Sequence, residues 1–285
     1  MSKSTAPGLR CGAKLLDLSS PVVMGVLNVT PDSFSDGGSF VGRDKAVARA
    51  GDMLESGAAI IDVGGESTRP GAAPVSVQEE LDRVMPVVEA LIREFQCIVS
   101  VDTSTPEVML AAANAGAGLI NDVRALQRPG ALDVVASLGL PVCLMHMQGQ
   151  PGTMQQNPNY KSIEREVMGF FVQRIDACVS AGVSKERLLL DPGFGFGKTL
   201  EHNMSLLSGL AGFSLLGLPL LVGVSRKTMI GEIVNKPVDQ RLCGSVAAAV
   251  LAVERGANIV RVHDVPETVD ALKVVAAMRG NDLVI

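Results

Sequence analysis

Eight short runs of β-branched and other aliphatic residues, separated by longer amphipathic stretches, limit the fold of this chain more than any other feature. This alternation is typical of parallel strands joined by helices. The runs are too apolar to be exposed on one face, which indicates strands that are covered on both faces. The predicted strands are residues 22–27, 59–63, 98–101, 118–120, 142–145, 187–190, 220–224 and 258–262.

Eight such units favour a closed (β/α)8 barrel, a fold of about 250 residues, and the chain has 285. No linker rich in Pro and Ser divides it. We therefore predict an α/β chain with a single TIM-barrel domain over residues 18–285, after an N-terminal tail over residues 1–17 that is expected to be disordered at its start. A doubly wound sheet is the alternative, but no Gly-x-Gly-x-x-Gly follows the first strand.

The ends of several helices can also be predicted. Ser76 and Glu79 have the spacing of a capping box. Thr105 before Pro106 is typical of an N-cap followed by proline in the first turn, and Gly116 is expected to end that helix. An apolar stripe with helical spacing follows farther along the chain, made of Ile163, Val167, Phe171, Ile175 and Cys178.

Composition narrows the class of protein. With 47% hydrophobic and 19% charged residues, the chain is globular rather than disordered. A net charge of −5 disfavours a general nucleic-acid binder, and the absence of a long uncharged apolar run predicts no membrane span. The five cysteines are scattered and never form Cys-x-x-Cys, which indicates reduced thiols and a cytoplasmic protein.

Polar residues follow all eight predicted strands. The carboxyl ends of the strands carry the active site in this fold, so we expect these side chains to lie together. They are Asn28 with Asp32 and Asp36; Glu66 to Arg69; Asp102; Asn121 with Asp122; His146; Asp191; Ser225 to Lys227; and Arg261, His263 and Asp264.

The chemical types of these residues point to a ligand. Asp102, Asn121 and Asp191 supply acceptors for a flat heterocycle with adjacent N–H donors, such as a 2-amino-4-oxopyrimidine ring, and Lys227 can donate to the acceptor edge of that ring. A second group is cationic and suits a phosphate-bearing substrate: Arg69, Arg226, Arg261 and His263. A third group, Asn28 with Asp32 and Asp36, offers hard oxygen ligands for Mg²⁺.

Other site types fit less well. The stretch that ends in Gly197-Lys198-Thr199 has Pro192 where a P-loop needs glycine. His146 and His263 lack a third ligand at zinc-type spacing, and His202 is expected at the surface or at an N-cap. A set of methionines, Met145, Met147 and Met154, either lines an apolar pocket or fills the core. The sequence has no Gly-x-Ser-x-Gly motif, which argues against an α/β-hydrolase.

The segments that surround the polar residues at the strand ends together resemble one family, the bacterial dihydropteroate synthases. The resemblance runs from about Leu18 to the C-terminus in the family's order. Its first block reads MGVLNVTPDSFSDGG, and a later one reads LDPGFGFGK. The matching segments are residues 24–38, 61–71, 100–103, 120–123, 144–147, 190–198, 223–227 and 261–265.

The resemblance implies a transferase that condenses 6-hydroxymethyl-7,8-dihydropterin diphosphate with p-aminobenzoate, giving 7,8-dihydropteroate and pyrophosphate, with Mg²⁺ as cofactor and a homodimer as assembly. It also implies that sulfonamides act on the protein. The implied ligands of the pterin diphosphate are Thr68, Asp102, Asn121, Asp191, Lys227, Arg261 and His263. Those of p-aminobenzoate are Thr68, Arg69, Pro70, Phe196, Ser225 and Lys227.

The same resemblance gives Asn28 as the residue that faces the metal, with Asp36 as a further candidate. The implied catalytic residues are Lys227, Arg261, His263, Asp36 and Arg69. We predict a dissociative substitution and assign no general base, since the arylamine is already neutral near pH 7. Two alternatives are a pterin-binding methyltransferase-type domain and a catalytically silent paralogue. A sugar-phosphate barrel enzyme would leave the convergence of Asp102, Asn121 and Asp191 unexplained.

Overall fold

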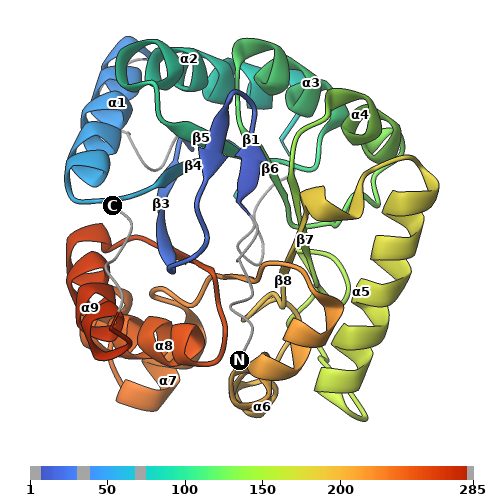
Figure 1. The fold of residues 1–285 in the computed structure, drawn as a ribbon, viewed down its shortest axis with the longest axis vertical. Helices are drawn as coiled ribbons and strands as arrows, with labels where there is room; N and C mark the ends of the chain where they lie inside the picture. The colour runs from blue at the N-terminus through green and yellow to red at the C-terminus, as the bar shows by residue number, and fades with distance from the viewer. Residues whose placement is uncertain (1–7, 31–38, 68–74, 281–285) are drawn as a thin grey trace.

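The computed structural model describes residues 8–30, 39–67 and 75–280, and within them eight parallel strands form one sheet that closes into a barrel (Figure 1). The ring closes between residues 188–191 and residues 220–222, where Leu190 forms a parallel bridge with Leu220 and the amide of Leu190 donates to the carbonyl of Pro219 at 3.0 Å. The strands, in the order β8-β7-β6-β5-β4-β3-β10-β9 around the ring, are β3 Val22–Asn28, β4 Ile60–Gly64, β5 Ile98–Asp102, β6 Leu119–Asp122, β7 Val142–Met145, β8 Leu188–Asp191, β9 Leu221–Val222 and β10 Ile259–Val262. The predicted TIM barrel is confirmed.

Helices surround the strands on the outside (Figure 1). They are α1 Ser39–Glu55, α2 Val77–Phe95, α3 Pro106–Ala115, α4 Ala131–Leu138, α5 Ile163–Ser180, α6 Leu200–Ser208, α7 Thr228–Val234, α8 Leu242–Glu254 and α9 Val265–Met278, with short 3-10 helices η2 Lys185–Arg187, η3 Leu210–Leu216 and η4 Val238–Gln240. No helix in the described ranges is long and apolar enough to span a membrane. All five cysteines are free thiols.

The predicted helix ends are found where the local chemistry requires them. Ser76 and Glu79 form the capping box of α2, with the Ser76 amide donating to Oε2 of Glu79 at 2.9 Å. Thr105 is the N-cap of α3 and Gly116 its C-cap, but the Thr105 hydroxyl donates to Oε2 of Glu80 at 2.6 Å instead of capping the helix. The predicted apolar stripe of α5 is buried.

A hairpin closes the N-terminal end of the barrel. Its strands, β1 Leu9–Cys11 and β2 Lys14–Leu16, pair antiparallel within the stretch that the sequence assigned to a tail. Leu9, Cys11 and Leu16 are buried against the inward-facing side chains at the bottom of the strands. At Gly118, a Cβ would lie only 3.0 Å from Cβ of Cys11, so glycine allows this close approach. Residues 8–17 therefore pack as part of the barrel.

Candidate active site

The interior of the barrel changes from apolar to polar along the strands. Every second residue of a strand points to the same face. The apolar layer above the hairpin consists of Met24, Ile60, Ile98, Leu119, Cys143, Leu189, Leu221 and Ile259. Two or four residues farther along the same strands come Asp62, Asp102, Asn121, Asp191, Arg261 and His263. The strands thus place a polar layer on an apolar floor, at the end where TIM-barrel enzymes have their active sites.

We call Asp62, Asp102, Asn121, Asp191, Lys227 and Arg261 the polar pit. Arg261 on β10 binds two of its carboxylates: Nε donates to Oδ2 of Asp62 at 2.6 Å, and Nη2 donates to Oδ2 of Asp102 at 2.8 Å. Nδ2 of Asn121 donates to the same oxygen of Asp62 at 3.1 Å. The other oxygen of Asp62 is buried and has no hydrogen-bond partner in the described part of the chain. The pit therefore holds a planar group with adjacent N–H donors against carboxylate oxygens.

Charge and burial act against each other in this cluster. Burial raises the pKa of Asp102, and the Arg261 guanidinium opposes that shift. Burial alone would lower the pKa of Arg261, but Asp62 and Asp102 outweigh it and hold that pKa above its ordinary value. Arg261 is therefore a permanent cation, and the carboxyl of Asp102 depends on it to ionise.

Asp191 and Lys227 form the other side of the pit. Oδ1 of Asp191 accepts from the Gly193 amide at 2.8 Å, and burial raises the pKa of this carboxyl while Lys227 opposes the shift. Burial lowers the pKa of Lys227 to about 8, and Asp191 opposes that shift. Nζ of Lys227 donates to the carbonyl of Phe194 and lies 4.6 Å from the ring centroid of Phe196. Lys227 thus joins the acidic pit to an aromatic wall.

Ser225 and His263 sit beside this wall. Oγ of Ser225 accepts from the His263 amide at 3.2 Å and lies 3.1 Å from its Nδ1. Burial, together with the nearby cations Arg261 and Arg226, lowers the pKa of His263 to about 4. Arg226 forms an ion pair with Asp264. The predicted cationic rim is therefore weaker than its composition indicates, because His263 is neutral at pH 7 and the charge of Arg226 is balanced.

Asn28 ends β3 at the mouth of the pit and is exposed. A Cβ at Gly64 would lie 3.7 Å both from Oδ1 of Asn28 and from Oδ2 of Asp102, so these two oxygens flank the same glycine. No group of three or more His, Cys, Asp or Glu that could hold a metal occurs within the described ranges. Mg²⁺ is usually held by one or two protein oxygens together with substrate phosphates. The amide oxygen of Asn28 fits that requirement without a preformed cage.

The structure brings nine predicted site residues together at the carboxyl-terminal end of the barrel: Asn28, Asp102, Asn121, Asp191, Phe196, Ser225, Lys227, Arg261 and His263. Five predicted site residues lie outside the described residues: Asp32, Asp36, Thr68, Arg69 and Pro70.

Sequence reasoning missed Asp62, which is fully buried and lies inside β4 instead of after it. A single charge within the aliphatic run 59–63 is the signal that indicates an interior role. It also missed the contact between Lys198, which it considered only as part of a P-loop, and His146, which it considered only as a zinc ligand. Nζ of Lys198 lies 2.9 Å from Nδ1 of His146, and both side chains are buried.

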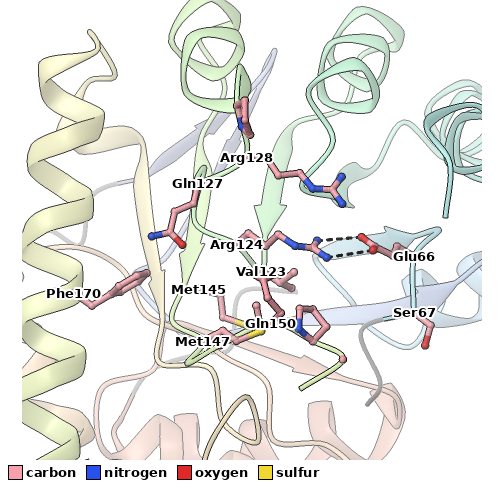
Figure 2. Close-up of a pocket in the computed structure, with 14 residues that line it drawn as sticks. Glu66, Ser67, Val123, Arg124, Gln127, Arg128, Met145, Met147, Gln150 and Phe170 are labelled. Atoms are coloured by element: carbon pink, nitrogen blue, oxygen red, sulfur yellow. Dashed lines mark hydrogen bonds and ion pairs between the residues drawn. The ribbon is translucent and has the colours of Figure 1, made fainter. Parts of the chain in front are cut away.

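A separate pocket of about 420 Å³ lies between the loops that follow β4, β6 and β7 (Figure 2). Phe170 of α5 lines one side, and on the other Arg124 forms an ion pair with Glu66 at 3.1 Å (Figure 2). Met145 and Met147 line this pocket, whereas Met154 is buried and does not. None of the residues of the polar pit lines it.

Comparison with known proteins gives concordant results. Residues 24–263 match the model of a family described as pterin binding enzymes. The dihydropteroate synthase of Escherichia coli strain K12 is 60% identical over 262 residues, which cover 92% of this chain and 93% of that protein. The Yersinia pestis dihydropteroate synthase, solved with a sulfonamide drug, has 57% identity and a TM-score of 0.92, covering 96% of this chain and 99% of the other.

The dihydropteroate synthase of Xanthomonas albilineans has been solved with 4-aminobenzoic acid, at 52% identity and a TM-score of 0.92 over 96% of this chain and 98% of that one. Its complex with 7,8-dihydropteroate has 50% identity and a TM-score of 0.88, over 96% and 99% of the two chains.

Proposed function

The chain belongs to the dihydropteroate synthase family of pterin-binding enzymes, and we propose that its polar pit and the adjoining wall carry out the family's condensation. The substrates are 6-hydroxymethyl-7,8-dihydropterin diphosphate and p-aminobenzoate, and the products are 7,8-dihydropteroate and pyrophosphate. The observation that carries this assignment is the arrangement of Asp102, Asn121, Asp191 and Lys227 around a guanidinium at one end of the barrel.

The pterin ring would take the place that the Arg261 guanidinium holds in the structure. The N–C–N edge of a 2-amino-4-oxopyrimidine presents adjacent N–H donors, as a guanidinium does, so the same carboxylates can accept from it. The acceptor edge of the ring would receive a hydrogen bond from Lys227, whose Nζ lies at the wall of the pit. Displacement from Asp62 and Asp102 would free Arg261 for the diphosphate, which a guanidinium binds through paired N–H groups.

Phe196, Ser225 and Lys227 would form the arylamine subsite for p-aminobenzoate. The Phe196 ring offers apolar surface to the benzene ring, and Nζ of Lys227 lies 4.6 Å from the centroid of the Phe196 ring. Thr68, Arg69 and Pro70, from the loop after β4, stay proposed members of this subsite, with Thr68 also proposed for the pterin diphosphate.

Mg²⁺ would be held by Asn28, with Asp36 as a further candidate, and by phosphate oxygens of the substrate. When bound, it supplies positive charge to the departing pyrophosphate. Arg261 would add a permanent cation on the same side, and His263 a neutral hydrogen-bonding group oriented by Ser225.

In the reaction the C–O bond between the pterin methylene and the diphosphate breaks, and the arylamine nitrogen then forms the new C–N bond and loses a proton. We propose a dissociative course, in which the electron-rich dihydropterin stabilises the cationic methylene. The residues would contribute positioning and stabilisation of the leaving group. A general base is not needed, because the neutral arylamine attacks through its lone pair.

The test is pyrophosphate release from the purified protein given the pterin diphosphate and Mg²⁺, with and without p-aminobenzoate and with and without EDTA. Release that requires p-aminobenzoate and yields dihydropteroate supports the synthase. Binding of the pterin diphosphate without release indicates the silent paralogue. Binding of pterins without any preference for the diphosphate indicates a methyltransferase-type domain. A release rate that survives EDTA contradicts the role of Mg²⁺.

We also propose a homodimer formed through the C-terminal helices. Large exposed apolar side chains gather on neighbouring elements there, namely Ile233 on α7, Val238 on η4, Leu251 on α8, and Val274 and Met278 on α9. The three helices lie side by side (Figure 1), and a second copy of the chain would remove these side chains from water.

The free cysteines support a reducing, cytoplasmic environment.

A further inference from the structure

Lys198 is a buried lysine that the proposed chemistry leaves without a role. It ends the loop between β8 and α6 and is only 3% exposed. Its Nζ lies 2.9 Å from the carbonyl oxygen of Gly193, 3.0 Å from that of Phe196 and 2.9 Å from Nδ1 of His146. The carbonyl oxygen of His146 lies farther away, at 3.4 Å. A lysine ammonium has three N–H donors and no acceptor, so the three nearer partners are enough to use all of them.

His146 completes this set as a neutral acceptor. Burial, and then the charge of Lys198, lower the pKa of His146 to about 3, so its ring is neutral at pH 7. Burial lowers the pKa of Lys198 well below its ordinary value, and Asp191 opposes that shift. With Nζ of Lys198 donating, Nδ1 of His146 carries the lone pair and Nε2 the proton. His146 therefore connects the end of β7 to the β8–α6 loop through Lys198.

Three glycines shape the loop, and further hydrogen bonds to it come from Tyr160 and Asn203. Gly193, Gly195 and Gly197 all have positive φ angles, of 69°, 79° and 64°, and glycine gives the backbone the most conformational freedom. At Gly193 a Cβ would collide with the carbonyl oxygen of His146, so the loop must pass directly against the end of β7. The two carbonyls held by Lys198 are those of the first and last residues of the turn 193–196.

The ammonium of Lys227 contacts two residues of this turn. Its Nζ donates to the carbonyl of Phe194 and lies over the ring of Phe196. The same turn begins with the Gly193 amide that binds Asp191. Any movement of the turn therefore displaces the aromatic wall and the ammonium of Lys227 together.

We propose that Lys198 is a positioning residue, which fixes the 193–196 turn and thereby preforms the arylamine subsite of Phe196, Ser225 and Lys227. This inference rests on the proposed function, since that function supplies the arylamine. Lys198 acts through the loop and does not touch either substrate. The pterin diphosphate has most of its proposed ligands on other strands, so loss of Lys198 is expected to affect the arylamine far more than the pterin.

The experiment compares Lys198→Met with the wild type and with Lys185→Met, which removes an exposed lysine from η2 at the opposite end of β8. Lys198→Met should raise the KM for p-aminobenzoate by about 10-fold or more, the factor for loss of one charge-assisted hydrogen bond. The KM for the pterin diphosphate should change by a clearly smaller factor, since Asp191 and Lys227 contact the turn but its other described ligands come from β5, β6 and the end of β10. Lys185→Met should alter neither constant.

Hydrogen exchange supplies a readout that does not depend on turnover. Amides within residues 193–197 should exchange faster in Lys198→Met than in Lys185→Met, while the amides of β5 and β6 keep their protection. His146 provides a second series in case Lys198→Met folds poorly. His146→Leu removes one acceptor and should shift the p-aminobenzoate KM in the same direction by a smaller factor, and His146→Asn, which restores an acceptor oxygen, should recover part of the loss.

Equal changes in the two KM values, or a Lys198→Met protein that loses only thermal stability, would show that Lys198 merely supports the fold. Unchanged exchange in residues 193–197 would also overturn the proposal. A wild-type protein that releases no pyrophosphate with p-aminobenzoate overturns the proposed function instead, so the two failures are distinguishable.

Discussion

Replacing Arg261 by methionine tests whether this guanidinium occupies the pterin position and then moves to the diphosphate. The side chain makes two ionic hydrogen bonds, at 2.6 Å to Asp62 and 2.8 Å to Asp102. A hydrogen bond to a charged group contributes about 1.5–3 kcal/mol. A pterin ring must replace these bonds to enter the pit, and the diphosphate then gives Arg261 new ones.

Two ligands separate these effects: 6-hydroxymethylpterin with and without its diphosphate. Arg261→Met should reduce the affinity advantage of the diphosphate ligand over the ligand without diphosphate by about 1.5–3 kcal/mol, or roughly 10- to 150-fold, because the charge-assisted contacts to phosphate are lost. For the ligand without diphosphate, affinity should stay within about 0.5 kcal/mol of the wild type or improve, because the competing guanidinium has been removed. Isothermal titration calorimetry at one pH measures both affinities in the wild type and in the variant.

Stability must be followed in the same variant. Removing one partner of a buried ion pair costs about 3–5 kcal/mol, so the urea midpoint should fall, and binding is measured at a temperature where the variant is folded. Arg93→Met is the matched control, since the Arg93 side chain is 68% exposed and pairs only with its neighbour Glu94. Equal losses of affinity for the two ligands would refute the reasoning, since they would mean that Arg261 does not discriminate the diphosphate.

Three further predictions concern other parts of the molecule. Asp191→Asn should cost about 1–3 kcal/mol of pterin affinity in direct titration, because one N–H of the ring loses its carboxylate; an unchanged affinity would place Asp191 outside the pterin subsite. Pterin affinity should fall as the pH rises through about 8, where the buried Lys227 loses the proton that it donates, and this decline should be absent in Lys227→Met; a flat wild-type profile from pH 7 to 9 contradicts the role of Lys227. Leu251→Glu and Val274→Glu should shift the protein from dimer to monomer in sedimentation velocity, whereas Leu215→Glu, at an 86% exposed leucine on η3, should not; a wild type that is monomeric at micromolar concentration contradicts the proposed dimer.

Two kinds of feature could be predicted from the sequence: the order of strands and helices along the chain, and contacts between residues close in sequence. Alternating strand and helix patterns require each strand end to be followed by a loop on the same side of the barrel. That is why Asp102, Asn121 and Asp191 could be assigned to one cavity from their positions alone. The capping box at Ser76 is equally local, because both of its hydrogen bonds join residues three apart.

The N-terminal hairpin could not be predicted in this way. Each of its strands has three residues, too few for a period-two pattern to stand out. What stabilises it is the contact of Leu9, Cys11 and Leu16 with the inner ends of the barrel strands. That contact depends on the closed barrel, which no local pattern encodes.

Electrostatic pairing was also beyond the sequence. Arg261 and Asp62 are 199 residues apart, and only barrel closure brings them to 2.6 Å. The charge of Arg226 is balanced by Asp264 from the next strand unit, and His263 is neutral because it is buried beside Arg261. A count of basic residues at the rim therefore overestimated its positive charge.

The position of Arg261 has a consequence for the order of events in the reaction. One guanidinium cannot bind Asp62 and Asp102 while it binds a diphosphate, so entry of the pterin ring and capture of its diphosphate are energetically coupled. A pterin that carries a diphosphate replaces every bond that Arg261 gives up.

The product, 7,8-dihydropteroate, has no diphosphate, so once pyrophosphate departs Arg261 has no anion to bind except the two carboxylates. Its return to Asp62 and Asp102 would compete with the pterin ring of the product and favour release. Arg261→Met should therefore retain dihydropteroate longer than the wild type, and stopped-flow displacement of dihydropteroate by excess 6-hydroxymethylpterin measures that rate directly. A dissociation rate as fast as that of the wild type would mean that product leaves without help from Arg261.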